Sequence, residues 1–129
     1  MDAFDLDGIF VPDIIYNSST FGLVQYSRMN LLRPIFYPKK SFVLITGRPV
    51  CDKDQTVLWL DIVGLKPEKV FHDNLDIKDS AQYKESVLLA NPEITRFIES
   101  DLSQVDYLRN RLDCEVVWFN DIIQGSLYR

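Results

Sequence analysis

The chain opens with a short apolar strand that runs into the segment Phe4-Asp5-Leu6-Asp7-Gly8. In extended backbone, residues i and i+2 point the same way, so we expect Asp5 and Asp7 to project into one small volume at the end of this strand. Two like charges there repel each other unless a cation or a shared proton holds them. Asp and Gly are also common turn residues, so the segment alone is equally compatible with a plain turn. Residues further along the chain decide between a site and a turn.

Length and composition limit what such a site can be built on. The chain has 129 residues, 47% of them hydrophobic, which suits one domain over residues 1–129 with a single core. No apolar run approaches the ~18 residues that span a bilayer, and the acidic opening lacks the basic region of a signal peptide. We therefore expect a cytoplasmic protein with no membrane partner. Cys51 and Cys114 form no CxxC pair, so we expect free thiols and oxygen ligands for any metal.

Charge is distributed unevenly along the chain. The net charge of -5 argues against broad, nonspecific nucleic-acid binding, yet no acid occurs between Ile14 and Cys51. The basic residues of this acid-free stretch are Arg28, Arg33, Lys39, Lys40 and Arg48. A basic stretch beside an acidic site suits an anionic substrate, and the alternative is that these are solvated surface charges.

Short apolar runs alternate with helical stretches, which predicts an α/β fold with a parallel sheet. We expect strands at 3–4, 42–45, 69–71, 96–98 and 116–119, and helices at 53–63, 80–90 and 102–112. The segment 18–32 has helical periodicity, but Gly22 and Thr20 weaken that interpretation and leave it open. The expected architecture is a doubly wound domain with the first strand central and the strand order 5-4-1-2-3.

The predicted helix ends rest on specific residues. The helix at 53–63 has an expected apolar face at Val57, Leu60 and Val63, and Gly64 is placed to terminate it. Ser80 is the expected cap of the helix at 80–90.

Three expected strands end in a polar residue. Asp5 follows the first strand, Thr46 the second and Glu99 the fourth. In parallel α/β sheets, ligands bind beyond the carboxyl ends of the strands where the winding reverses, so we expect these three side chains to converge. A single strand-terminal Thr or Glu is typical of a turn or a cap. Three of them in this order, with the second carboxylate at Asp7, favour a site.

The chemistry that this set supports is phosphoryl transfer through a covalent aspartyl intermediate. Asp5 is the candidate nucleophile, and Asp7 would protonate the leaving oxygen and then activate water. Thr46 and the amide of Gly47 would hydrogen-bond the transferring phosphoryl oxygens. Lys84, with Lys78 as second choice, would neutralise the charge that builds on them.

A divalent cation and a basic approach complete the predicted site. Mg²⁺ would be held by the Asp5 carboxylate, the Asp7 backbone carbonyl and Glu99, with Asp101 as a helper. The predicted substrate-binding residues are Gly47, Arg48, Lys39 and Lys40.

Four segments carry a family resemblance. FDLDGIF and FVLITGRP resemble the first and second motifs of haloacid dehalogenase-like phosphatases, and Lys84 and Glu99 fall where the third and fourth motifs would. A closer similarity is to the 3′-phosphatase domain of phage polynucleotide kinases, in the segments ITGRP, DKDQTVLWL, YKESVLL, FIESDLSQVDYLRNRL and EVVWF. The resemblance implies a Rossmann-like fold with helices on both faces of the sheet. It also implies an Mg²⁺-dependent phosphomonoesterase that acts on a phosphorylated substrate, a nucleotide or a polynucleotide 3′ end.

Two departures from the family pattern affect this interpretation. Ile9 stands where Thr or Val is usual, and Ser100 replaces an acid in Glu99-Ser100-Asp101, where paired aspartates are usual. The second change keeps open an alternative, a weak or inactive phosphate-binding or interaction module. The short intervals between the motifs hold no large cap domain. In this family a missing cap suits a large substrate such as a polynucleotide end, with a small nucleotide as the alternative.

Overall fold

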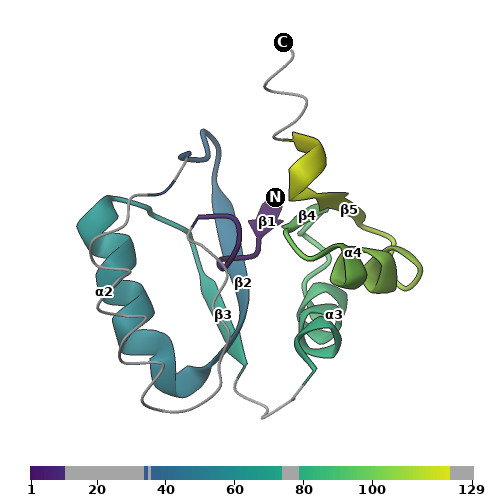
Figure 1. Ribbon diagram of the computed structural model, residues 1–129, viewed down its shortest axis with the longest axis horizontal. Helices are drawn as coiled ribbons and strands as arrows, with labels where there is room; N and C mark the ends of the chain where they lie inside the picture. Colours follow the sequence, from purple (N-terminus) through teal and green to yellow (C-terminus); the bar gives the residue numbers. More distant parts are fainter. Residues whose placement is uncertain (11–33, 35, 74–78, 123–129) are drawn as a thin grey trace.

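A computed structural model describes residues 1–10, 34, 36–73 and 79–122. In this part of the chain five parallel strands form one sheet in the order β3-β2-β1-β4-β5 (Figure 1). The strands are β1 Asp2–Phe4, β2 Phe42–Pro49, β3 Val70–Asp73, β4 Arg96–Glu99 and β5 Glu115–Trp118. The predicted α/β class and parallel sheet are confirmed. Read from β5, the strand order is 5-4-1-2-3, with β1 central.

β1 is central because it pairs on both sides and is buried on both faces. It pairs with β2 through Phe4↔Leu44 and with β4 through Phe4↔Ile98, so these three side chains share one face of the sheet. Ala3 and its partners in the neighbouring strands belong to the core on the opposite face. This two-sided burial explains why the strands are nearly continuous apolar runs.

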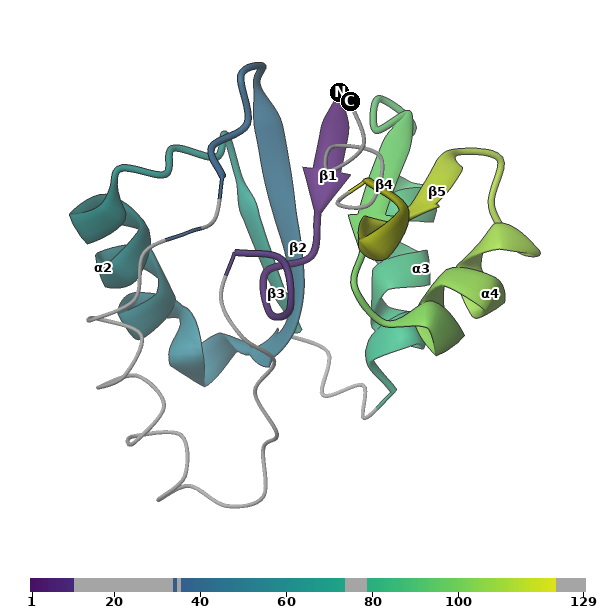
Figure 2. The ribbon, with the colours of Figure 1, turned by 45° about the horizontal axis from the view of Figure 1, so that its top comes forward.

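Helices cover both faces of the sheet (Figure 2). The helix α2 Lys53–Val63 follows the short 3₁₀ helix η1 Val50–Asp52 and packs on the Phe4 face. The helices α3 Ser80–Ala90 and α4 Leu102–Arg109 pack on the Ala3 face. Parallel strands need such crossover connections, which bring every strand's carboxyl end to the same edge of the sheet.

Several predicted details need correction. The N-cap of α3 is Asp79 rather than Ser80, because the Asp79 carboxylate accepts hydrogen bonds from two backbone amides of the first turn. The helix α4 ends at Arg109, short of the predicted 112, because the Arg111 amide turns back to the Leu108 carbonyl. The predicted apolar face of α2 is wrong at Val57, which is 45% exposed. The buried face of α2 consists of Thr56, Trp59, Leu60 and Val63.

The strand β2 extends further than predicted, through Thr46, Gly47 and Arg48 to Pro49. It continues because β3 pairs with it past a register shift between Ile45 and Pro49. Gly64 ends α2 as predicted, in the left-handed conformation (φ 79°) that glycine adopts without strain.

Some predictions concern residues that the structure does not describe. The segment 18–32 and the side chains of Arg28, Arg33 and Lys78 lie outside the described residues. Of the helices in the described residues, none is long and apolar enough to cross a membrane.

Candidate functional site

Asp5 lies at the centre of the carboxyl edge of the sheet. It directly follows β1, and its backbone amide donates to the Ile98 carbonyl of β4 over 2.9 Å, which continues the parallel pairing for one more residue. Its side chain is buried, and the Leu6 amide donates to Asp5 Oδ1 over 2.9 Å. Because β1 lies between β2 and β4, Asp5 is flanked by the middle of β2 and by the carboxyl end of β4. The predicted convergence at this edge is therefore observed for Asp5 and Glu99.

Lys84 joins these two carboxylates. Its Nζ lies 2.5 Å from Glu99 Oε1 and 3.3 Å from Asp5 Oδ1. It also donates to Gln104 Oε1 over 2.9 Å, which connects α3 to α4. Lys84 and Glu99 are almost completely buried, at 2% and 0% exposure. A buried charge of this kind is tolerated only when partners satisfy it, and Lys84 has three.

The charges of this cluster do not cancel. Burial raises the pKa of Asp5 well above its usual value, Lys84 opposes that rise, and Glu99 adds to it. Burial alone would lower the pKa of Lys84, but the charges of Asp5 and Glu99 outweigh burial and raise that pKa. One ammonium therefore serves two carboxylates, and the raised pKa of Asp5 means that the fold favours a proton on this carboxyl. A cation bound at Asp5 would take the place of that proton.

Ser100 brings a further oxygen to Asp5. Its Oγ lies 3.0 Å from the Asp7 carbonyl, 3.4 Å from Asp5 Oδ2 and 3.4 Å from Glu99 Oε2. A hydroxyl has one proton to donate, so it satisfies at most one of these acceptors at a time. The carboxylate and carbonyl oxygens around Ser100 are metal ligands of the type that hard cations such as Mg²⁺ prefer.

Glu99 and Asp101 are engaged in ways that the sequence did not predict. Glu99 Oε1 binds Lys84, and Glu99 Oε2 accepts from the Ser100 and Asp101 amides over 2.8 and 3.2 Å. Asp101 caps α4 by accepting from the Ser103 amide and hydroxyl. Burial would raise the pKa of Asp101, but the hydrogen bonds from Ser103 outweigh it and lower that pKa. Both carboxylates thus have structural partners already.

The fit to Mg²⁺ follows from this inventory. Within the described ranges there is no group of three or more His, Cys, Asp or Glu side chains that could hold a metal ion. Mg²⁺ nevertheless needs only one or two carboxylates when waters and substrate phosphate complete its shell. Ser100 Oγ lies 3.4 Å from Asp5 Oδ2 and 3.0 Å from the Asp7 carbonyl, and these three oxygens fit such a site.

Arg48 binds Asp7 rather than standing free for substrate. Its Nη2 lies 2.5 Å from Asp7 Oδ1 and its Nε lies 2.9 Å from Asp7 Oδ2. Its Nη1 donates to Thr56 Oγ1 over 3.2 Å, and the whole side chain is 1% exposed. Planar two-point pairing of this kind fixes the orientation of a carboxylate. Arg48 therefore fixes the Asp7 carboxylate by both of its oxygens.

Thr46 and Gly47 lie at the carboxyl end of β2. Thr46 is fully buried, and its hydroxyl accepts from the Arg48 amide over 3.1 Å. A Cβ added at Gly47 would lie 2.3 Å from Ser80 Oγ and 3.0 Å from Ser80 Cβ, so the Ser80 side chain in the first turn of α3 packs closely against β2 at this glycine. This close approach positions α3 and, one turn later, Lys84.

Lys39 and Lys40 are not brought to Asp5. They precede the first residue of β2, whereas Thr46 lies near its other end. Lys40 is separated from Thr46 by six steps of nearly extended chain, which at ~3.3 Å per residue is roughly 20 Å. Both lysines instead line a cavity at the opposite edge of the sheet.

Two site residues escaped sequence reasoning about chemistry. Gln104 lies in a predicted helix, and no local signal distinguishes it from a surface glutamine. Thr56 accepts a hydrogen bond from Arg48 Nη1, and no pattern in the sequence predicts that contact.

Comparisons with protein-family models, with curated proteins and with solved structures give no significant match. The class that the fold and the site define is therefore a structural one. It is an α/β protein whose parallel sheet carries a buried Asp5–Lys84–Glu99 cluster at the carboxyl end of its central strand.

Proposed function

We propose that this chain is a phosphomonoesterase of the haloacid dehalogenase-like kind, with Asp5 as the nucleophile. The observation that carries the proposal is the contact of Asp5 with Lys84, and of Lys84 with Glu99, at the carboxyl end of the central strand. Open α/β sheets bind ligands at this edge. A nucleophilic carboxylate next to a buried ammonium and to unused oxygen ligands suits attack on an anionic phosphate ester.

The first chemical step transfers the phosphoryl group to Asp5. A carboxylate oxygen of Asp5 attacks phosphorus, the bond from phosphorus to the ester oxygen breaks, and Asp7 donates a proton to that oxygen. Lys84 would hold Asp5 in place and balance charge on the phosphoryl group. The Thr46 hydroxyl and the Gly47 amide would hydrogen-bond the transferring oxygens. Mg²⁺, held by the Asp5 carboxylate, the Asp7 carbonyl and the Ser100 hydroxyl, would screen the repulsion between Asp5 and the substrate dianion.

The second step returns Asp5 to its starting state. Asp7, now ionised, takes a proton from a water molecule, and that water attacks phosphorus of the aspartyl phosphate. The bond between phosphorus and Asp5 breaks, and inorganic phosphate leaves. For Asp7 to exchange protons in this way, at least one of its two oxygens must leave Arg48, since both are bound.

The alternative is a phosphate-binding or interaction module with little or no activity. Ser100, in place of an acid, removes one charge from the cation site, and Arg48 occupies both oxygens of the candidate general acid. These two contacts are the observations that favour it.

The deciding assay is phosphate release from an aryl phosphate and from a 3′-phosphorylated oligonucleotide, each with Mg²⁺ and with a chelator. We expect Mg²⁺-dependent turnover that Asp5→Asn abolishes, since that change keeps the shape and removes the attacking charge. Asp61→Asn, the same change at an exposed position of α2, is the matched control and should retain full turnover. Turnover by Asp5→Asn would contradict the covalent mechanism. No release from either substrate, with phosphate binding intact, would favour the module.

A further inference from the structure

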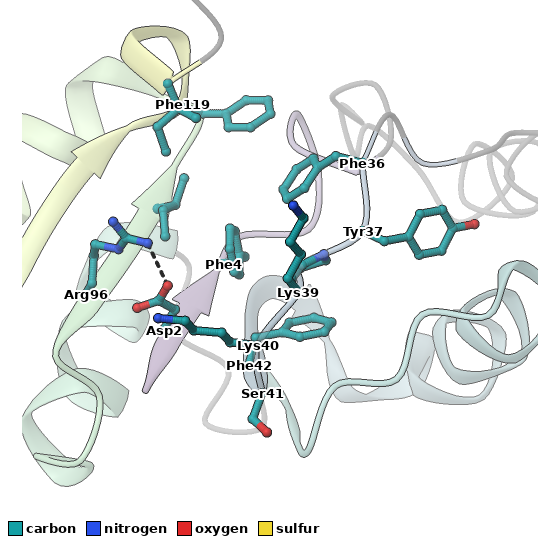
Figure 3. A pocket seen from close by; sticks show the side chains of 13 residues that line it. Asp2, Phe4, Phe36, Tyr37, Lys39, Lys40, Ser41, Phe42, Arg96 and Phe119 are labelled. Atoms are coloured by element: carbon teal, nitrogen blue, oxygen red, sulfur yellow. Dashed lines mark hydrogen bonds and ion pairs between the residues drawn. The ribbon is translucent and has the colours of Figure 1, made fainter. Parts of the chain in front are cut away.

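A second candidate site lies at the opposite edge of the sheet from Asp5. A cavity of about 670 Å³ opens where β1, β2 and β4 begin (Figure 3). None of the residues of the candidate site at Asp5 lines it. Its volume falls within the ~300–1,000 Å³ typical of pockets for small molecules.

The cavity wall is largely aromatic. Phe4, Phe36, Phe42 and Phe119 line it together with Ile98. Phe36 stacks on Phe119 with ring centres 5.7 Å apart and planes 28° apart, and it also stacks on Phe10 at 4.9 Å and 23°. Phe36 is only partly buried, so part of its ring stays open to a ligand. Phe10 and Phe119 lie against the two faces of the Phe36 ring, so a flat aromatic ligand would meet the part of the ring edge that stays exposed, in the edge-to-face arrangement that aromatic pairs also favour.

The rim of the cavity is positively charged. Arg96 Nη2 lies 2.7 Å from Asp2 Oδ2, so these two side chains neutralise each other. Lys39 and Lys40 are exposed at the same rim (Figure 3), and neither forms an ion pair with any other residue that the structure describes. Two unpaired ammonium groups beside an aromatic wall favour a ligand that carries both a flat apolar body and an anionic group.

We propose that this cavity binds a planar aromatic anion with the chemistry of a nucleotide. The base would pack against the exposed edge of Phe36 and the aromatic wall around it, and the phosphate would lie against Lys39 and Lys40, as aromatic and basic side chains combine in sites for single nucleotide units. The nucleotide can be free or one unit of a strand. This site does not depend on catalysis at Asp5.

The test is calorimetric titration of Asp5→Asn protein, which leaves the ligand intact, with adenosine monophosphate, adenosine and inorganic phosphate. Lys39→Ala/Lys40→Ala should weaken the monophosphate on the order of tenfold and leave adenosine unchanged. Lys69→Ala, which removes one charge from an exposed site above Phe71, is the control and should change nothing. Phe36→Leu, which keeps apolar volume but removes the aromatic ring, should weaken both adenosine compounds about fivefold or more.

Further titrations distinguish a free nucleotide from one unit of a strand, and a nucleotide from other anions. An oligonucleotide without a terminal phosphate that binds more tightly than the monophosphate, and loses affinity in the same variants, supports a strand as the source. Equal affinities support a free nucleotide. The proposal is overturned if the monophosphate binds no more tightly than inorganic phosphate, if the double lysine variant leaves its affinity unchanged, or if octanoate binds more tightly.

Discussion

Arg48 on β2 binds both carboxylate oxygens of Asp7: its Nη2 lies 2.5 Å from Oδ1 and its Nε lies 2.9 Å from Oδ2. Asp7 follows the neighbouring strand β1. Asp7 lies two residues after Asp5, the candidate nucleophile, and Arg48 also donates a hydrogen bond from Nη1 to Thr56 on α2. The site and the packing of α2 against the sheet are therefore linked through one guanidinium group.

Arg48→Lys should lower the free energy of unfolding by about 1–3 kcal/mol. A lysine is a point charge that cannot reproduce the two-point pairing, and Thr56 would lose its hydrogen bond to Nη1. Urea denaturation measures this loss. Thr56→Val removes the hydrogen bond from Arg48 Nη1 and the one that Thr56 donates to the Asp52 carbonyl, but it keeps the Arg48–Asp7 pair, so it is the comparison and should cost less. If both variants unfold like the native protein, the pair contributes no stability.

Sequence reasoning succeeded where the information is local. Apolar runs with polar ends predict the strands, and the end of α2 follows from Gly64. It failed where contacts are distant along the chain. Asp7, the partner of Arg48, lies 41 residues earlier, so the residues around Arg48 predict a contact with substrate and not the ion pair. Lys39 and Lys40 are close to Thr46 in sequence, but they precede β2 and Thr46 lies well inside it, so the extended strand separates them in space.

The predicted face of α2 shows a different limit. Hydrophobic periodicity places Val57 inward, but the buried positions include Thr56 and the much larger Trp59. The buried Thr56 hydroxyl is satisfied by Arg48 Nη1 and by the Asp52 carbonyl, and a pattern of apolar residues cannot predict such polar contacts. The role of Ser100 was likewise invisible, because its contacts to Asp5 and Asp7 span 95 and 93 residues.

The stability difference between Asp5→Asn and the native protein should depend on pH. Burial raises the pKa of Asp5 in the folded state, so the folded chain holds that proton at pH values where the unfolded chain has lost it. The contribution of Asp5 to stability is therefore greatest below its usual pKa near 3.8 and falls as the pH rises towards the folded value. Asp5→Asn has no such proton, so its stability relative to the native protein should improve from pH 4 to pH 7.

Urea denaturation of both proteins at several pH values, without divalent cations, measures this difference. Glu85→Gln, a change at a partly buried carboxylate outside the Asp5 cluster, is the control. A difference that is flat with pH would mean that Asp5 titrates alike in both states.

Ser100→Asp should strengthen Mg²⁺ binding tenfold or more, on the order of 1.4 kcal/mol. The change places a carboxylate where a hydroxyl now lies 3.0 Å from the Asp7 carbonyl and 3.4 Å from Asp5 Oδ2. A second carboxylate supplies the charge that an Mg²⁺ site with a single carboxylate lacks. Calorimetric titration with Mg²⁺ measures the change independently of turnover. Ser100→Ala should bind Mg²⁺ no better than the native protein. Unchanged affinity in Ser100→Asp would exclude these oxygens as the cation site.

Gly47→Ala should destabilise the protein by about 1–3 kcal/mol, and the cause should be Ser80. The added Cβ would lie 2.3 Å from Ser80 Oγ and 3.0 Å from Ser80 Cβ, so the Ser80 hydroxyl must rotate away and α3 must give by a few tenths of an ångström. In the double variant Gly47→Ala/Ser80→Ala the nearest clash is gone, and only the milder contact with Cβ persists. A double-mutant cycle by urea denaturation should therefore show that Ser80→Ala recovers part of the loss caused by Gly47→Ala.

Because Lys84 lies one turn into α3, a shift of this helix would also move the ammonium away from Asp5, and turnover should fall in Gly47→Ala and rise again in the double variant. Additive effects of the two substitutions would show that the space at Gly47 is not limited by Ser80.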